Sequence, residues 1–132
     1  MLVSTEGIVL KQRKIANNRR IIVLFTKKYG KINAGTNINE KGRGKAALAL
    51  RPFALSEYEL YKRGSYYNIN GTELKESHYS LGEKLDRFIT ASSMINYVEK
   101  VVQEEQPNPK LFELSRDFLT VVATADANFG TL

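Results

Sequence analysis

The chain has 132 residues, of which 42% are hydrophobic and 26% charged, close to the usage of ordinary globular proteins. It contains no cysteine and a single histidine, which excludes disulfides and thiol catalysis and argues against a metal site or a catalytic triad. The sequence has no apolar run near the roughly 18 residues of a membrane span, and its start lacks the pattern of a signal peptide. Composition therefore predicts a cytoplasmic binding domain rather than an enzyme.

The positive charge is concentrated in the first part of the chain. Residues 1–80 carry 15 Lys and Arg against six acids, whereas residues 81–132 carry five against eight. Residues 11–51 alone hold 12 basic residues and one acid, Glu40. Such a basic block is typical of proteins that bind polyanions, because each cation near a phosphate releases condensed counterions. A basic face that only keeps the protein soluble is the alternative.

Short apolar runs in the first half predict β-strands, because they are rich in β-branched residues and too short for helices. Three such runs are expected at residues 5–11, 20–26 and 31–36. The second of these is unbroken, which indicates burial on both faces or closure of a barrel. A tight turn joins it to the third, and Gly30 is expected to supply a positive φ there.

Alternating apolar and polar residues predict a fourth strand over 53–61, and residues 65–70 predict a fifth. A polar loop at 37–45 and a short helix at 46–50 separate these strands from the first three. Five strands in this order predict a closed OB-fold barrel over residues 1–80. An SH3-like barrel is the alternative.

The second half predicts a helical hairpin. Apolar residues recur every three or four positions from Leu81 to Val102, which indicates one amphipathic helix of about six turns. Pro107 and Pro109 end this helix, and a second apolar stripe starts at Leu111. Two helices cannot bury a sizeable core by themselves. Residues 81–132 are therefore interpreted as the beginning of a truncated α-helical domain, so that the fold class is mainly β plus α.

Basic residues gather in the predicted loops and turns of the barrel, where OB-folds hold single strands of nucleic acid. The candidate DNA contacts are Lys11, Arg13, Lys14, Arg19, Arg20, Lys27, Lys28, Tyr29, Lys31, Lys41, Arg43, Lys45 and Arg51. Contacts of this kind give affinity and salt dependence with little sequence preference. Tyr29 is the first candidate for base stacking, followed by Tyr66 and Tyr67. Phe25 and Phe53 are expected in the core.

Catalysis finds little support in the sequence. The acidic pairs Glu57/Glu59 and Glu104/Glu105 have no nucleophile or metal ligand at a readable spacing. His78 lies at the junction of the two halves, where a packing role is expected. No phosphate-binding loop is present either, because the glycines at 42–45 lack its spacing. The sequence therefore predicts no catalytic residue and no metal ligand.

Five segments, taken in order and spacing, resemble a known family. They are residues 6–10, 22–32, 51–53, 75–77 and 106–114. Together they are similar to the N-terminal portion of the RecO family of bacterial DNA-repair and recombination-mediator proteins, over essentially all 132 residues. The resemblance implies an N-terminal OB-fold followed by a helical domain that often carries a four-cysteine zinc motif. That motif would lie beyond this chain, so no cofactor is expected here and zinc is possible only in a C-terminal part.

The resemblance also implies function and partners. Family members bind single- and double-stranded DNA, anneal strands coated by single-strand-binding protein, and work with RecR to load the recombinase RecA. This chain is accordingly expected in the bacterial cytoplasm, associated with the nucleoid and not with a membrane. An RNA-binding OB module and a protein-interaction module without direct DNA binding are the alternatives, since both would share the charge pattern.

Overall fold

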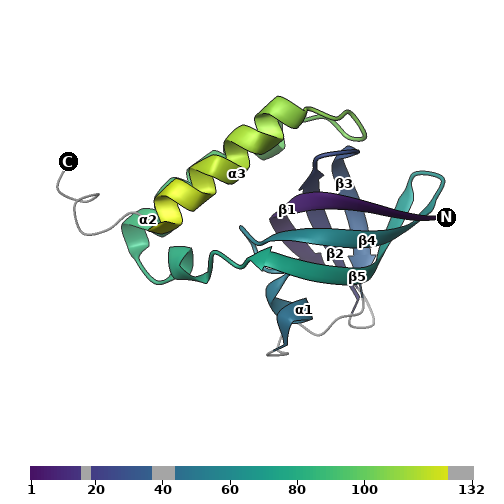
Figure 1. Cartoon of the computed structure of the whole chain (residues 1–132), viewed down its shortest axis with the longest axis horizontal. Helices are drawn as coiled ribbons and strands as arrows, with labels where there is room; N and C mark the ends of the chain where they lie inside the picture. Colours follow the sequence, from purple (N-terminus) through teal and green to yellow (C-terminus); the bar gives the residue numbers. More distant parts are fainter. Residues whose placement is uncertain (16–18, 37–43, 125–132) are drawn as a thin grey trace.

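A computed structural model shows a β-barrel followed by a helical hairpin, and it describes residues 1–15, 19–36 and 44–124 (Figure 1). The strands are β1 (Leu2–Lys14), β2 (Arg20–Thr26), β3 (Gly30–Thr36), β4 (Leu55–Arg63) and β5 (Tyr66–Glu76). The helices are α1 (Lys45–Leu48), the 3₁₀ turn η1 (Tyr79–Gly82), α2 (Leu85–Val101) and α3 (Pro109–Thr124). In the part of the chain so described, no helix has both the length and the apolar character needed to cross a membrane.

The five strands close into a barrel in the order β1-β2-β3-β5-β4. Closure requires β1 to pair with both β2 and β4, and its register shifts between Val9 and Lys11 where it passes from one partner to the other. The barrel is completed by a short parallel pairing of β3 with β5 at Ala34 and Tyr67. This is the strand order of an OB-fold, so the predicted barrel is confirmed and the SH3-like alternative is set aside.

Several predicted strand boundaries are wrong. The fourth strand was predicted over 53–61, but β4 starts at Leu55 and ends at Arg63 because Phe53 belongs to the turn before it. The first strand is longer than residues 5–11 because its two ends have different pairing partners. The fifth strand continues beyond residue 70 to Glu76. Gly71 pairs with Glu59 at a register shift of β4 and β5, so this glycine lies beside a bulge rather than at the end of the strand.

The helical hairpin is confirmed, but its first helix starts later than predicted. Leu81 is buried in η1, and α2 begins only at Leu85. Leu85 and Phe88 were expected on the buried stripe, yet 74% and 45% of their surfaces are exposed. The buried residues of α2 all lie further along, at Ala91, Ile95 and Val98. Pro109 starts α3, where the missing N–H of a proline leaves no helical hydrogen bond unmade.

The described residues form two buried apolar clusters, and β2 contributes to both. Ile22 and Leu24 point into the barrel, whereas Val23 and Phe25 pack with the helices in the second cluster. This arrangement explains the unbroken apolar run of β2, which was predicted to be buried on both faces. The second cluster contains residues of β1, β2, η1, α2 and α3, so the hairpin is packed against one side of the barrel by a shared core (Figure 1).

Ion pairs reinforce this packing at the surface. Glu6 of β1 accepts a hydrogen bond from Lys75 at 2.5 Å and lies 3.5 Å from Arg116 of α3. Burial raises the pKa of the Glu6 carboxyl, but the hydrogen bond and the positive charges of Lys75 and Arg116 outweigh burial and bring it below its ordinary value. Glu6 therefore stabilises the fold in its ionised form.

Glu6→Gln is expected to remove a stabilisation that depends on pH. A carboxyl with a lowered pKa in the folded state contributes above its ordinary pKa of 4.5, and this contribution is lost as the pH falls further. We expect the variant to be less stable by about 0.5–1 kcal/mol at pH 7 and to approach the wild type near pH 3. Urea unfolding at both pH values measures this difference. An equal difference at both would contradict the ionic role.

Candidate nucleic-acid interface

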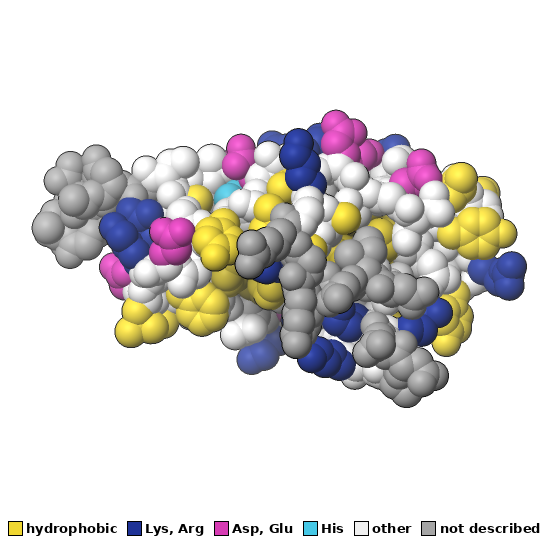
Figure 2. Space-filling view, turned by 90° about the horizontal axis from the view of Figure 1, so that it is seen from below, with side chains coloured by type: hydrophobic (Ala, Val, Ile, Leu, Met, Phe, Trp, Pro, Cys, Tyr) yellow, Lys and Arg dark blue, Asp and Glu magenta, His cyan; other side chains and the backbone are white. Residues whose placement is uncertain are grey.

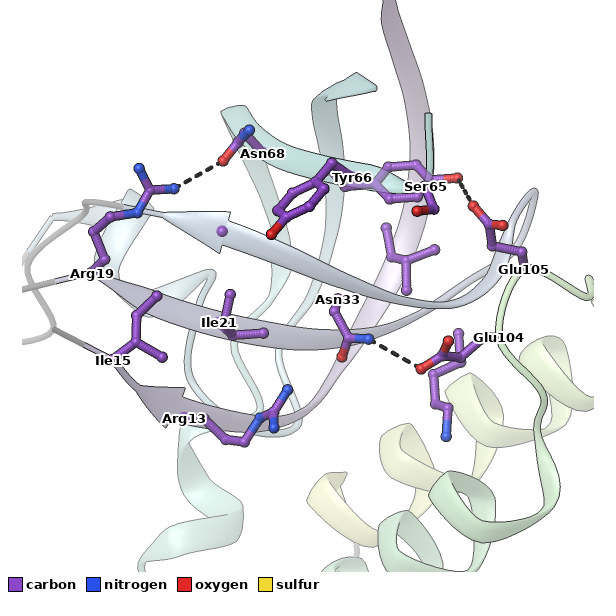
Figure 3. Close-up of a pocket in the computed structure, with 14 residues that line it drawn as sticks. Arg13, Ile15, Arg19, Ile21, Asn33, Ser65, Tyr66, Asn68, Glu104 and Glu105 are labelled. Atoms are coloured by element: carbon purple, nitrogen blue, oxygen red, sulfur yellow. Dashed lines mark hydrogen bonds between the residues drawn. The ribbon is translucent and has the colours of Figure 1, made fainter. Parts of the chain in front are cut away.

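A groove of about 650 Å³ crosses β2 and β3 and is bordered by the start of β5. Figure 3 shows the residues that line it. They come from β1, β2, β3 and β5, from the connections between β1 and β2 and between β4 and β5, and from the linker between α2 and α3. This is the face on which OB-folds hold single-stranded nucleic acid.

Two arginines border one end of the groove. Arg13 lies near the end of β1 and Arg19 directly before β2, and the side chains of both are exposed. Arg19 donates a hydrogen bond to Asn68 Oδ1 at 3.1 Å, across β3 (Figure 3). Its Nη2 would lie 2.8 Å from a Cβ at residue 35, so Gly35 gives the guanidinium room to cross the strand. Planar guanidinium groups at such an edge suit phosphate oxygens.

The three tyrosines considered for base stacking differ in accessibility, and only Tyr66 and Tyr67 line the groove. Tyr66 is 74% exposed, and its ring extends over the groove from β5 (Figure 3). Tyr67 is buried, and Tyr29 is half-buried against it with the ring centroids 6.3 Å apart. The ammonium group of Lys62 lies 5.7 Å from each of these two ring centroids. Geometry therefore favours Tyr66 over Tyr29 for stacking on a base.

Acidic residues border the opposite end of the groove. Glu104 and Glu105 belong to the linker between α2 and α3, next to Lys31 of β3. The hydroxyl of Tyr67 donates to Glu105 Oε1 at 3.1 Å. Burial raises the pKa of Tyr67 to about 12, and the hydrogen bond to Glu105 contributes to this rise. The groove thus has a positive and a negative end.

Several predicted DNA contacts are engaged elsewhere in the molecule. Lys11 forms an ion pair with Glu99, and Lys27 forms one with Glu113 at 3.4 Å. Arg20 is only 3% exposed, and its guanidinium donates to a neighbouring glutamine at 2.8 Å inside the barrel. In this conformation Arg20 has almost no surface to offer a phosphate.

Of the remaining predicted residues, Lys28 lies in the turn between β2 and β3, and Lys45 and Arg51 lie in and just after α1. Lys14, Lys28 and Lys45 are exposed, and Arg51 is partly buried with its guanidinium 5.9 Å from the ring centroid of Tyr79. Lys41 and Arg43 fall outside the described residues. Figure 2 shows Lys and Arg side chains along the lower part of the face seen there, with acids mostly along its upper edge and at the helical end.

His78 has the packing role that its position suggests. It is 7% exposed, and its Nδ1 lies 2.6 Å from the carbonyl oxygen of Phe53. Its backbone has a φ of 51°, which makes the turn from β5 into η1. Over residues 1–15, 19–36 and 44–124, no group of three or more His, Asp or Glu side chains could hold a metal ion.

Barrel, groove and hairpin define an OB-fold protein with an appended helical segment. The family described as "Recombination protein O N terminal" matches residues 1–78, and the chain belongs to this RecO family. It is 40% identical over 114 residues to the DNA repair protein RecO of Alkaliphilus metalliredigens, covering 86% of this chain and 46% of that protein.

Two further relatives carry the same name. The DNA repair protein RecO of Thermoanaerobacter sp. is 32% identical over 92% of this chain and 49% of its own length. That of Caldanaerobacter subterraneus is 31% identical over 89% of this chain and 48% of its own length. The chain thus spans about half the length of the relatives it matches. The family resemblance expected from the sequence is confirmed.

Proposed function

We propose that this chain binds DNA along the groove over β2 and β3, as part of a bacterial DNA-repair protein. The observation that supports this most directly is the convergence of Arg13, Arg19 and the exposed ring of Tyr66 on one groove. The arginines would contact phosphates, and Tyr66 would stack on a base, a contact worth about 1–3 kcal/mol. The names of the relatives support a role in DNA repair.

Strand annealing is the activity that we propose for this binding. A cationic surface that neutralises two phosphate backbones lowers the cost of bringing complementary strands together and leaves their bases free to pair. This process needs no covalent chemistry, no catalytic residue and no cofactor in this segment. We further propose that the protein acts in the cytoplasm at the nucleoid, on single- and double-stranded DNA. Its proposed protein partners are RecR, single-strand-binding protein and, indirectly, RecA.

Fluorescence anisotropy of a labelled single-stranded oligonucleotide, titrated at several salt concentrations, tests the proposal. Three to five phosphate contacts predict a slope of about −2 to −3.5 for log affinity against log salt. A steep slope with preferential competition by DNA would support the proposal. Preferential competition by RNA would favour an RNA-binding module instead. No binding at low salt would contradict direct DNA binding by this segment and favour a protein-interaction module.

A further inference from the structure

The linker between α2 and α3 is docked on the end of the β2–β3 hairpin by backbone contacts. The N–H of Glu105 donates to the carbonyl oxygen of Lys31 at 3.0 Å, and Glu104 forms a β-bridge with the same residue. Gly30, at a φ of 71°, faces the linker so closely that a Cβ would lie 2.4 Å from the carbonyl oxygen of Gln106. Such a contact leaves no room for a side chain, so the position of the linker is fixed by main-chain geometry.

Docking of the linker brings two carboxylates to the groove, where neutral partners hold them. Asn33 Nδ2 donates to Glu104 Oε1 at 3.2 Å, and the hydroxyl of Tyr67 donates to Glu105 Oε1 at 3.1 Å. Asn33 lies on β3 and Tyr67 on β5, two strands that form the groove. Figure 3 shows both glutamates at the end of the groove opposite Arg19. The hydrogen bonds from Asn33 and Tyr67 add no positive charge to compensate these carboxylates.

A lysine also lines this end of the groove, and its side chain is held toward α2. Lys31 Nζ donates to the backbone carbonyl oxygen of Glu99 at 3.2 Å. This hydrogen bond leaves the ammonium charged, so a phosphate at this end would meet two carboxylates and one lysine. A phosphate at the other end would meet Arg13 and Arg19, with no carboxylate beside them among the described residues that line the groove. Like charges within a few ångströms repel, and the groove wall screens them less than bulk water does.

We infer that Glu104 and Glu105 act as an electrostatic stop, which confines a bound DNA strand to the arginine end of the groove and shortens the stretch of strand that is held. This inference rests on the proposed function, because it concerns the path of DNA in that groove. The two glutamates determine the length and course of the bound strand by repelling its phosphates. In specificity terms, they are the repulsive element of the site.

The double substitution Glu104→Gln/Glu105→Gln tests this role. Glutamine has the shape of glutamate and can still accept from Asn33 and Tyr67, so the linker stays docked while the two charges are removed. The matched control is Glu76→Gln/Glu83→Gln, which changes the net charge equally at exposed positions outside the groove. Thermal unfolding of both variants verifies that each remains folded.

The readouts are anisotropy with single-stranded oligonucleotides of increasing length and the salt slope of binding. We expect the groove variant to bind about three- to tenfold more tightly at low salt. We also expect its salt slope to steepen by about 0.7 for each phosphate gained, and its optimal oligonucleotide to lengthen. The control should keep the length dependence of the wild type.

The outcomes separate the two proposals. If the wild type binds and the groove variant matches the control in affinity, slope and length dependence, the stop is overturned and the proposed DNA binding stands. Weaker binding by a folded groove variant would equally overturn the stop. If none of the three proteins binds at low salt, DNA binding in the groove is itself contradicted, and the stop with it.

Discussion

Replacing Phe112 with alanine is expected to lower the free energy of unfolding by about 3–5 kcal/mol. The side chain is fully buried, and its ring meets Phe25 of β2 edge-on with the centroids 5.6 Å apart. The surrounding cluster contains residues from strands and helices that backbone hydrogen bonds hold in place. A cavity left by the ring therefore cannot collapse easily, and its cost adds to the lost burial. Urea denaturation measures the change.

Leu114→Ala is the matched control for this substitution. Leu114 lies two residues further along α3 and is 65% exposed, so its truncation should change stability by about 0.5 kcal/mol or less. Because the cluster around Phe112 spans barrel and hairpin, we also expect one unfolding transition for the wild type. A similar loss for both variants, or separate transitions for barrel and hairpin, would contradict the shared core.

Local sequence signals predicted the strands of the barrel well and their ends less well. The bounds of β2 were predicted correctly, because its apolar run ends at the residues that leave the sheet. β1 was predicted too short, because its pairing with two different strands depends on closure of the barrel and leaves no periodic signal. The start of α2 was also misplaced. The periodicity places Leu85 and Phe88 on the same apolar stripe as the later residues of α2. It does not show how little of the described chain packs over this part of the stripe, which leaves both side chains exposed.

The candidate site was predicted in kind but only partly in detail. A count of charges is enough to place Arg13 and Arg19 on a basic barrel, and the structure brings both to the groove. The charge count cannot show that Lys11 is paired with Glu99, since the two residues are far apart in the sequence. Glu104 and Glu105 were considered only as catalytic candidates, because no local signal shows that the linker returns to β3. Gly30 was predicted for its positive φ, which is confirmed at 71°.

The double substitution Arg13→Glu/Arg19→Glu is expected to have the largest effect on function. Each arginine can form a charge-assisted hydrogen bond with phosphate, worth about 1.5 kcal/mol or more. Losing both contacts should weaken binding of single-stranded DNA about 100-fold at low salt, and the two new carboxylates add repulsion. The salt slope should become shallower by about 1.4, because two fewer counterion-releasing contacts remain. Annealing of complementary oligonucleotides should fall in parallel.

The lower net charge of this variant would by itself weaken DNA binding, so the control variant must lower the net charge by the same amount at positions outside the groove. Lys84→Glu/Lys100→Glu alters two exposed lysines at and near the ends of α2, outside the groove. If long-range attraction dominates, both double variants lose affinity alike, and the groove is not the DNA site. If the groove holds the strand, the control loses only the long-range part, which salt near 0.15 M largely screens. At that salt concentration the arginine variant should still bind and anneal far more weakly than the control. Unchanged annealing by the arginine variant would overturn the proposed mechanism, because its phosphate contacts would then be unnecessary.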